Sequence, residues 1–291
     1  MIEHLAVLDV EDDSPESLVL PSGPLTLRKA WPRSKEHLLL EYVDRQGGVV
    51  PGQWMRDAGQ LLRIADETAD KCPNAPPVVV QTDHTRILLQ PGGADRRLIG
   101  LSALLSRPDS TLLSHRPERR AVVRLHGATD QRYAKVVRPS RVRRVVESAQ
   151  CLGGWPDRPF GVPEVIEVDE SRGVVMFAVL PGVRLHELLD AGERFIDSAR
   201  AAGKALRSFH SAAPKQAQEH DAQAEIRVLQ KWLDDLKAFR PAPYRRLGNA
   251  PARVFEALAT DSSRPTMIHR DFYDKQIIID PAGLVGILDL D

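Results

Sequence analysis

The sequence predicts an α+β protein with two lobes, and three features of the chain support this class. From residue 116 onward, strand-like segments with one helix come first. A Pro-Gly joint at residues 181 and 182 then interrupts the strands, and amphipathic helices follow it. The chain ends with two short apolar segments, which we expect to form a hairpin. Strands grouped before helices in this way are typical of an α+β arrangement.

Composition limits the classes of protein to which the chain can belong. Its 291 residues suffice for one large domain or two ordinary ones. The 40 basic and 40 acidic residues cancel, which argues against a nucleic-acid partner or binding to an anionic membrane. The charge is uneven, however, because residues 116–144 are strongly basic and would suit a locally anionic ligand.

The cysteines and the apolar segments indicate the compartment. Cys72 and Cys151 lie far apart in the sequence, so we expect no disulfide framework and favour a reducing cytoplasm. No apolar run approaches the ~20 residues that span a bilayer. The N-terminal segment soon turns acidic and lacks the basic region of a signal peptide. We therefore expect a cytoplasmic protein with no membrane or nucleic-acid partner, and its oligomeric state stays open.

Residues 1–115 contain strand and helix patterns but no cluster of chemically reactive residues. Apolar runs between Gly, Pro and Asn turns indicate strands, and apolar residues at helical spacing indicate two short helices. We expect a β-rich accessory region that packs on the domain that follows. The expected strands cover residues 25–29, 38–43, a short piece near 49, 78–81 and 86–90, and the expected helices cover 56–69 and 99–105.

The middle of the chain changes from strands to helices. Up to Leu180 the pattern is that of strand pairs around one helix, and beyond Gly182 apolar residues recur at helical spacing. The expected strands cover residues 120–125, 132–137, 162–168 and 173–180, and the expected helices cover 140–152, 185–189, 195–210, 224–239 and 252–258.

The last 25 residues organise the functional prediction. Residues 276–280 and 284–288 are short Val- and Ile-rich runs joined by a Pro-Ala-Gly turn, a pattern typical of a buried hairpin. Because a hairpin brings its two ends together, we expect Asp271, Gln276 and Asp289 to converge on one rim. Oxygen ligands gathered in this way suit a hard cation such as Mg²⁺, which proteins usually share with substrate phosphates.

This spacing fits phosphoryl transfer. The reaction needs a carboxylate near the attacking hydroxyl, metal ligands beside the phosphates, and a cation on the phosphate oxygens. Asp271 can supply the first requirement. Gln276 and Asp289 can supply the second, because amide and carboxylate oxygens both bind Mg²⁺.

The segments H-R-D-F-Y-D-K-Q, which begins at residue 269, and G-I-L-D-L-D, which begins at residue 286, resemble the aminoglycoside phosphotransferase and choline kinase-like group. That group has the pattern HxDxxxxN followed by a metal-binding Asp, and the resemblance runs from about residue 116 to the end. It implies a bilobal protein kinase-like fold, with a small β-rich lobe over residues 116–180 and a helical lobe over 181–291. It also implies an ATP-dependent transferase that moves the γ-phosphate to a hydroxyl of a small molecule, with Mg²⁺ and with Asp271 as catalytic base.

The resemblance further implies parts upstream of the hairpin. Lys135, on the second strand of a predicted strand pair, corresponds to the lysine that touches the ATP phosphates, and Glu147 on the next helix corresponds to its glutamate partner. The strand that ends in Leu-Pro-Gly corresponds to the adenine-binding hinge, which places backbone groups of Ala178 and Leu180 at the adenine edge.

Departures from the family pattern keep a second function open. Gln276 replaces the usual Asn, and Arg270 stands where small-molecule kinases more often have Gly. The resemblance implies further helices after the metal-binding Asp, so we expect a helical lobe that is truncated after Asp289; Asp291 is either a further metal ligand or a frayed end. The alternative function is therefore a nucleotide-binding pseudokinase or an inactive truncated kinase-like module. The acceptor stays open among aminoglycosides, sugars, choline and protein hydroxyls.

Overall fold

The computed structural model describes residues 17–81, 86–127, 131–153, 155, 158–211, 219–260 and 266–290. The chain divides into two compact units. The first unit falls within residues 1–124, 136–138 and 220–262, and the second falls within 125–135, 139–219 and 263–291.

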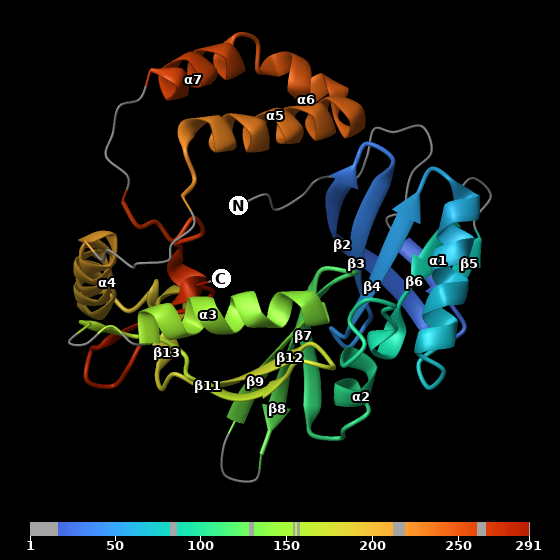
Figure 1. Ribbon diagram of the computed structural model, residues 1–291, viewed down its shortest axis with the longest axis horizontal. Coiled ribbons are helices and arrows are strands. Elements are labelled where there is room, and N and C mark those ends of the chain that lie inside the picture. Colours follow the sequence, from blue (N-terminus) through green and yellow to red (C-terminus); the bar gives the residue numbers. More distant parts are fainter. Residues whose placement is uncertain are drawn as a thin grey trace. The chain divides into compact units, whose positions relative to one another are not determined.

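The first unit is built on an antiparallel sheet with the strand order β1-β2-β3-β4-β6-β5. Helix α1 (Ala58–Lys71) begins after Asp57, whose side chain caps its first turn. Its apolar face places Leu61 and Ile64 in one buried cluster with Met55 and Leu88, so α1 lies along this sheet (Figure 1). The strands are β1 (Ser17–Leu20), β2 (Gly23–Ser34), β3 (His37–Val43), β4 (Val49–Met55), β5 (Val78–Gln81) and β6 (Arg86–Leu89).

Three consecutive helices belong to the same unit. They are α5 (Ala222–Phe239), α6 (Pro241–Arg246) and α7 (Ala250–Ala259), and α6 and α7 both pack back on α5 (Figure 1). The ring of Phe239 meets Trp54 edge-on at a centroid distance of 6.5 Å, so the end of α5 belongs to the core of the first sheet. The two compact units have other limits than the domains expected from the sequence, which were 1–115, 116–180 and 181–291. Compact units and functional domains need not coincide, so the expected domains stay a prediction.

A second sheet has the strand order β11-β12-β9-β8-β7, and the boundary between the units crosses β8 and β9. Helix α3 (Val142–Gly153) packs on β11 and β12. Two short helical elements, η1 (Pro91–Gly93) and α2 (Leu101–Leu105), precede this sheet, and η2 (Pro139–Arg141) leads into α3. The strands are β7 (Ser110–Arg116), β8 (Arg120–His126), β9 (Gln131–Val137), β11 (Val165–Asp169) and β12 (Val174–Ala178).

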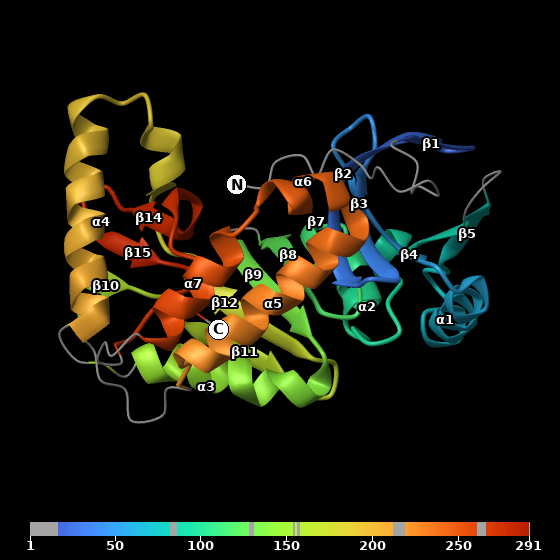
Figure 2. The same cartoon turned by 90° about the horizontal axis from the view of Figure 1, so that it is seen from above.

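The second unit contains a small sheet with the order β10-β15-β14-β13. Its centre is the hairpin of β14 (Ile277–Ile279) and β15 (Val285–Ile287), which confirms the two apolar strands predicted at the end of the chain. Helix α4 (Glu193–Ser211) covers the hairpin and shares its core, and Figure 2 shows α4 beside β14 and β15. The other elements are β10 (Phe160–Gly161), β13 (Val183–Arg184), η3 (Leu185–Leu188) and η4 (Asp274–Gln276).

The expected Pro-Gly joint has a specific steric role. Gly182 has a φ of 125°, and a Cβ built on it would lie 2.2 Å from the carbonyl oxygen of Ile279. Only glycine accepts both this backbone conformation and this approach. The joint thereby allows Val183 to pair with β14, which connects the strand of the predicted hinge to the hairpin.

The α+β class is confirmed, and most expected elements are present with shifted ends. Strand β2 continues to Ser34, beyond the expected end at residue 29, although it contains Pro32. A proline is tolerated there because β1 pairs only with the start of β2, and because the β2–β3 register shifts just after Pro32. Among the described residues, no helix is long and apolar enough to cross a membrane. The cytoplasmic location stays a prediction.

Replacing Gly182 by Ala should destabilise the second unit by about 3 kcal/mol or more, because the new methyl group collides with backbone in a conformation that disfavours side chains. Gly203 is the matched control, since it lies in α4 with no atom within 4 Å of a built Cβ. Gly203→Ala should instead stabilise the protein by about 0.5–1 kcal/mol. Urea denaturation of both variants measures the two effects. Equal stability of Gly182→Ala and the wild type would contradict the joint described here.

Candidate active site

The end of the β14–β15 hairpin brings two predicted metal ligands together. Ile277 lies opposite Ile287, and one step further the amide of Leu288 donates a hydrogen bond of 2.9 Å to the carbonyl oxygen of Gln276. Asp289 follows directly. Gln276 and Asp289 therefore lie at the same end of the hairpin, as the sequence predicted from the turn.

His269 fastens the loop that contains Asp271 to this end. Its Nε2 donates a 2.7 Å hydrogen bond to the carbonyl oxygen of Leu288, and its ring packs between Phe209 and Phe272, at centroid distances of 6.2 and 5.7 Å. A carbonyl can only accept, so Nε2 must hold the proton. Asp271 follows two residues later and is exposed. The ring thus positions the loop and leaves the carboxylate of Asp271 open to solvent.

The backbone is strained both in the loop of Asp271 and just after β15. Arg270 has a φ of 67° and Asp289 a φ of 56°, a left-handed conformation that is uncommon for residues other than glycine. Such strain persists only where surrounding contacts hold it, and it concentrates at functional sites. Here the contact of His269 with Leu288 joins the two strained segments.

Lys135 reaches the same end of the hairpin from strand β9. Its Nζ lies 2.9 Å from Oδ1 of Asp289, and the side chains of the two residues are 9% and 25% exposed. A lysine and a carboxylate 154 residues apart in the sequence thus form a largely buried ion pair. The contact places the expected phosphate-binding cation beside the expected metal ligand.

Glu147 has a different partner from the one implied by the family resemblance. It lies on α3, where its carboxylate accepts a 2.7 Å hydrogen bond from Arg143, one turn earlier on the same helix. Lys135 is paired with Asp289 instead. The structure therefore does not bring Glu147 and Lys135 together.

The predicted hinge is held by packing against the hairpin. The amide of Ala178 already donates to the carbonyl oxygen of Glu164, at 2.9 Å, just before β11 begins. Leu180 packs against Gly286 so closely that a Cβ on this glycine would lie 2.7 Å from Leu180 Cδ1. The absence of a side chain at residue 286 therefore lets the hinge segment approach β15.

One contact at the site has no counterpart in the sequence analysis. Nδ1 of His186 and Oδ2 of Asp274 are 2.7 Å apart, which connects η3 to η4, the turn that ends in Gln276. The two residues are 88 positions apart, and no sequence pattern pairs His186 with Asp274. Their pairing follows only from the packing of η3 against η4.

The donor set fits a shared magnesium site better than a closed metal centre. Within the described ranges, no group of three or more His, Cys, Asp or Glu side chains is arranged to hold a metal ion. Gln276 and Asp289 offer an amide oxygen and a carboxylate, and Mg²⁺ commonly takes its remaining ligands from phosphates and water. Asp291, considered above as a further ligand, lies outside the described residues.

Comparison with known proteins identifies the family. Residues 36–291 match the sequence profile of the phosphotransferase enzyme family. The matched range includes both the loop of Asp271 and the strand of Lys135. The chain belongs to this family. Membership confirms the resemblance seen in the sequence and, with it, the kinase-like fold class. The match begins well before residue 116, so it also includes most of the expected accessory region. No curated protein matches the chain.

Solved structures with a similar arrangement are distant in sequence. Macrolide 2'-phosphotransferase MphH from Brachybacterium faecium is 15% identical, with a TM-score of 0.42 over 62% of this chain and 65% of that protein. Aminoglycoside phosphotransferase APH(4)-Ia is 12% identical, with a TM-score of 0.46 over 63% and 66%. Aminoglycoside phosphotransferase APH(3'')-Id from Streptomyces rimosus is 18% identical, with a TM-score of 0.49 over 66% and 74%. The chain thus spans about 65% of the length of the first two.

Replacing Asp289 by Asn should lower the free energy of unfolding by about 2 kcal/mol, because it removes the charge that faces a largely buried lysine. Asn tolerates a positive φ as well as Asp does, so the backbone is unaffected. Asp197→Asn is the control, since Asp197 pairs with Arg200 on the exposed face of α4, and it should change the stability by about 0.5 kcal/mol or less. Urea denaturation measures both. Equal effects of the two variants would show that the Lys135–Asp289 pair does not stabilise the unit.

Proposed function

We propose that the protein is an ATP-dependent kinase that transfers the γ-phosphoryl group to a hydroxyl of a small molecule. The single observation that carries the proposal is the ion pair of Lys135 with Asp289 at the end of the hairpin. In this pair Lys135 is a cation that can bind phosphate oxygens, and Asp289 is a carboxylate that can bind Mg²⁺. Both lie next to the loop of Asp271. Membership in the phosphotransferase enzyme family supports the same reaction class.

Asp271 is the proposed catalytic base. Its exposed carboxylate accepts the proton of the acceptor hydroxyl while the acceptor oxygen attacks the γ-phosphorus. The new bond joins this oxygen to phosphorus, and the bond between the γ-phosphorus and the bridging oxygen breaks, so that the electron pair leaves with ADP. His269 contributes indirectly, because its hydrogen bond to Leu288 holds the loop in place.

Lys135 is the proposed phosphate-binding residue, and Gln276 and Asp289 are the proposed metal ligands. When bound, Mg²⁺ would supply positive charge to the β- and γ-phosphate oxygens. Lys135 would exchange Asp289 for the phosphate oxygens when the nucleotide binds. Glu147 can then take part only if it exchanges Arg143 for Lys135, since its carboxylate is engaged on α3 without nucleotide.

The adenine edge is the proposed ligand of the hinge. Because the Ala178 amide is used in the sheet, Ala178 can contribute only its carbonyl oxygen, as acceptor from the adenine amino group. Leu180 follows two residues later, outside the strand, and its amide can donate to a ring nitrogen. Its side chain, packed on Gly286, ties this hinge position to the hairpin.

The acceptor is proposed as a class. Relatives among the solved structures are named for macrolide and aminoglycoside substrates, which are small molecules with several hydroxyl groups. The proposed partner is therefore a hydroxylated small molecule, and no nucleic acid or membrane surface is involved.

A second candidate function is a nucleotide-binding pseudokinase. It is favoured by one observation: Glu147 is paired with Arg143 and Lys135 with Asp289, so the Lys–Glu pair that the family resemblance implies is not formed. In that case Mg-ATP would bind and stabilise the protein without turnover for any acceptor.

Asp271→Ala should lower kcat for phosphoryl transfer by about 10²–10⁴-fold, because it removes the base without touching the nucleotide ligands. Turnover is measured as ATP consumption with a panel of aminoglycosides, macrolides, sugars and choline. Asp280→Asn is the control: Asp280 turns the same hairpin by accepting a hydrogen bond from the Leu284 amide, which Asn can also accept. It should keep wild-type turnover. Turnover that survives Asp271→Ala would contradict the assignment of the base, and nucleotide binding without any turnover in the wild type would favour the pseudokinase.

A further inference from the structure

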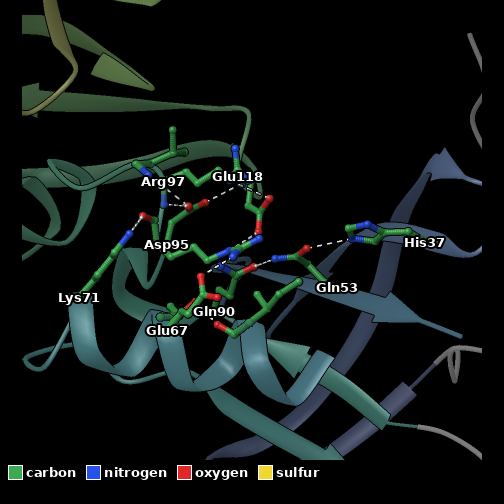
Figure 3. A network of polar contacts seen from close by, with 12 residues as sticks. His37, Gln53, Glu67, Lys71, Gln90, Asp95, Arg97 and Glu118 are labelled. Carbon is green, nitrogen blue, oxygen red and sulfur yellow. Dashed lines mark hydrogen bonds and ion pairs between the residues drawn. The ribbon is translucent and has the colours of Figure 1, made fainter. Parts of the chain in front are cut away.

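A buried carboxylate holds one loop of the first unit rigid. Asp95 is 0% exposed. Its Oδ2 is 2.9 Å from Nε2 of His115 and accepts the Glu118 amide at 2.7 Å, and its Oδ1 accepts the amides of Arg97 and Leu98 at 2.8 and 3.1 Å (Figure 3). Burial alone would raise the pKa of Asp95, but these hydrogen bonds and the neighbouring His115 outweigh it, so the pKa is lowered. The carboxylate thus fixes the backbone on which Arg97 and Glu118 stand.

A chain of amides supports the same loop from the sheet. His37 Nε2 is 2.9 Å from Gln53 Oε1, Gln53 donates to Gln90 at 2.8 Å, and Gln90 donates to the carbonyl oxygen of Ala94 at 2.6 Å. The side chains of Gln53 and Gln90 are fully buried. Figure 3 shows these residues in a row that leads to Asp95. Such a fully bonded polar network rigidifies its surroundings.

Four arginines converge on the neighbouring residue Glu118. Its carboxylate, 1% exposed, lies 2.8 Å from Arg33, 2.7 Å from Arg96 and 3.4 Å from Arg97. Its carbonyl oxygen accepts a 2.8 Å hydrogen bond from Nε of Arg138. Glu118 itself has a φ of 58°, so the turn is held in a left-handed conformation. The buried carboxylate of Glu118 therefore gathers three guanidinium groups, and its backbone carbonyl oxygen binds a fourth.

The cluster contains more positive than negative charge. Arg96 also pairs with Glu67, but the carboxylate of Asp95 is already taken by His115 and by backbone amides. Arg33, Arg97 and Arg138 therefore share the single charge of Glu118. Burial, followed by the charges of Arg97 and Arg33, lowers the pKa of Arg138.

Donor groups in the cluster remain available. Arg138 uses its Nε for Glu118, and the nearest contact of the Arg97 side chain is its Nε at 3.4 Å. Within the part of the chain that the structure describes, the terminal amino groups of these two arginines donate no hydrogen bond. The Arg97 side chain is 43% exposed, so solutes can reach it. A guanidinium group with a free fork binds phosphate oxygens in pairs.

We propose that Arg33, Arg97 and Arg138 form a binding site for a tetrahedral oxyanion, either inorganic phosphate or the phosphate group of a small phosphomonoester. The rigid loop of Asp95 and Glu118 positions the arginines before the ligand arrives, which lowers the cost of binding. A phosphate dianion has three terminal oxygens, enough for the forks of Arg97 and Arg138 together. The site is distinct in its residues from the proposed nucleotide site and does not depend on the proposed function.

Thermal-shift titration tests the site. Sodium phosphate and glucose 6-phosphate are each added to the full chain, with sodium chloride at matched ionic strength as reference. Both phosphates should raise Tm above the chloride reference, because a ligand that binds only the folded state stabilises it. Tighter binding of the monoester would assign the site to a phosphorylated small molecule, and tighter binding of the free ion would assign it to phosphate itself.

Three variants locate the effect. Arg97→Gln and Arg138→Gln should each raise the apparent Kd for phosphate by about tenfold or more, since each removes a charge-assisted pair of hydrogen bonds. Arg107→Gln removes the same charge from the same unit, but Arg107 is bonded to Asp109 through two nitrogen atoms and should leave the Kd unchanged. The partly exposed Arg97 keeps the test valid if Arg138→Gln does not fold.

Lys135→Met separates the proposed site from the nucleotide site. The proposal expects this variant to keep the phosphate-dependent rise in Tm. A rise that is lost in Lys135→Met but retained in Arg97→Gln would place the anion at the nucleotide site and overturn the proposal. No rise above the chloride reference would overturn it as well, and would leave the arginines the role of holding Glu118.

Discussion

The pairing of β14 with β15 is the constraint on which the candidate site depends. Ile277, Ile279 and Ile287 are buried in the core under α4, and a slip of β14 by one residue would put Ile278 together with Gln276 or Asp280 on that face. The register is therefore fixed by burial. With it fixed, Gln276 and Asp289 must lie at one end of the hairpin, and the bond from His269 to Leu288 brings the loop of Asp271 to that end. Lys135 completes the set because Asp289 is held in reach of β9.

The sequence was sufficient where local pattern and burial agree. The hairpin could be predicted because Ile-rich runs on both sides of a Pro-Ala-Gly turn allow few alternatives. Ion-pair partners could not be predicted in the same way. Glu147 lies one helical turn from Arg143, and this local pair competes with a long-range pair to Lys135 that only the family resemblance implied. The contact of His186 with Asp274 joins residues that no local pattern connects.

The first unit contains a buried polar cluster that the sequence did not reveal. Asp95, His115 and Glu118 stand in polar segments that resemble solvated loops, and the sequence analysis found no cluster there. The fold buries all three, and it collects Arg33, Arg97 and Arg138 from three separate segments around them. The basic character of residues 116–144 was visible in the sequence, whereas the burial of Glu118 near the start of this segment was not. A net charge of zero thus conceals a local excess of positive charge.

The packing of α5 could not be predicted from the sequence either. Residues 224–239 were predicted as a helix, but the contact of Phe239 with Trp54 follows from tertiary packing alone.

The central claim is that Lys135 and Asp289 form the two halves of one site for phosphate and metal. Calorimetric titration of ATP, with Mg²⁺ and with EDTA, into the wild type, Asp289→Asn and Lys135→Met tests it most directly. The account predicts that Mg²⁺ strengthens ATP binding in the wild type, that Asp289→Asn removes this dependence on Mg²⁺, and that Lys135→Met weakens binding in both conditions. An unchanged dependence on Mg²⁺ in Asp289→Asn, with wild-type affinity in Lys135→Met, would contradict it.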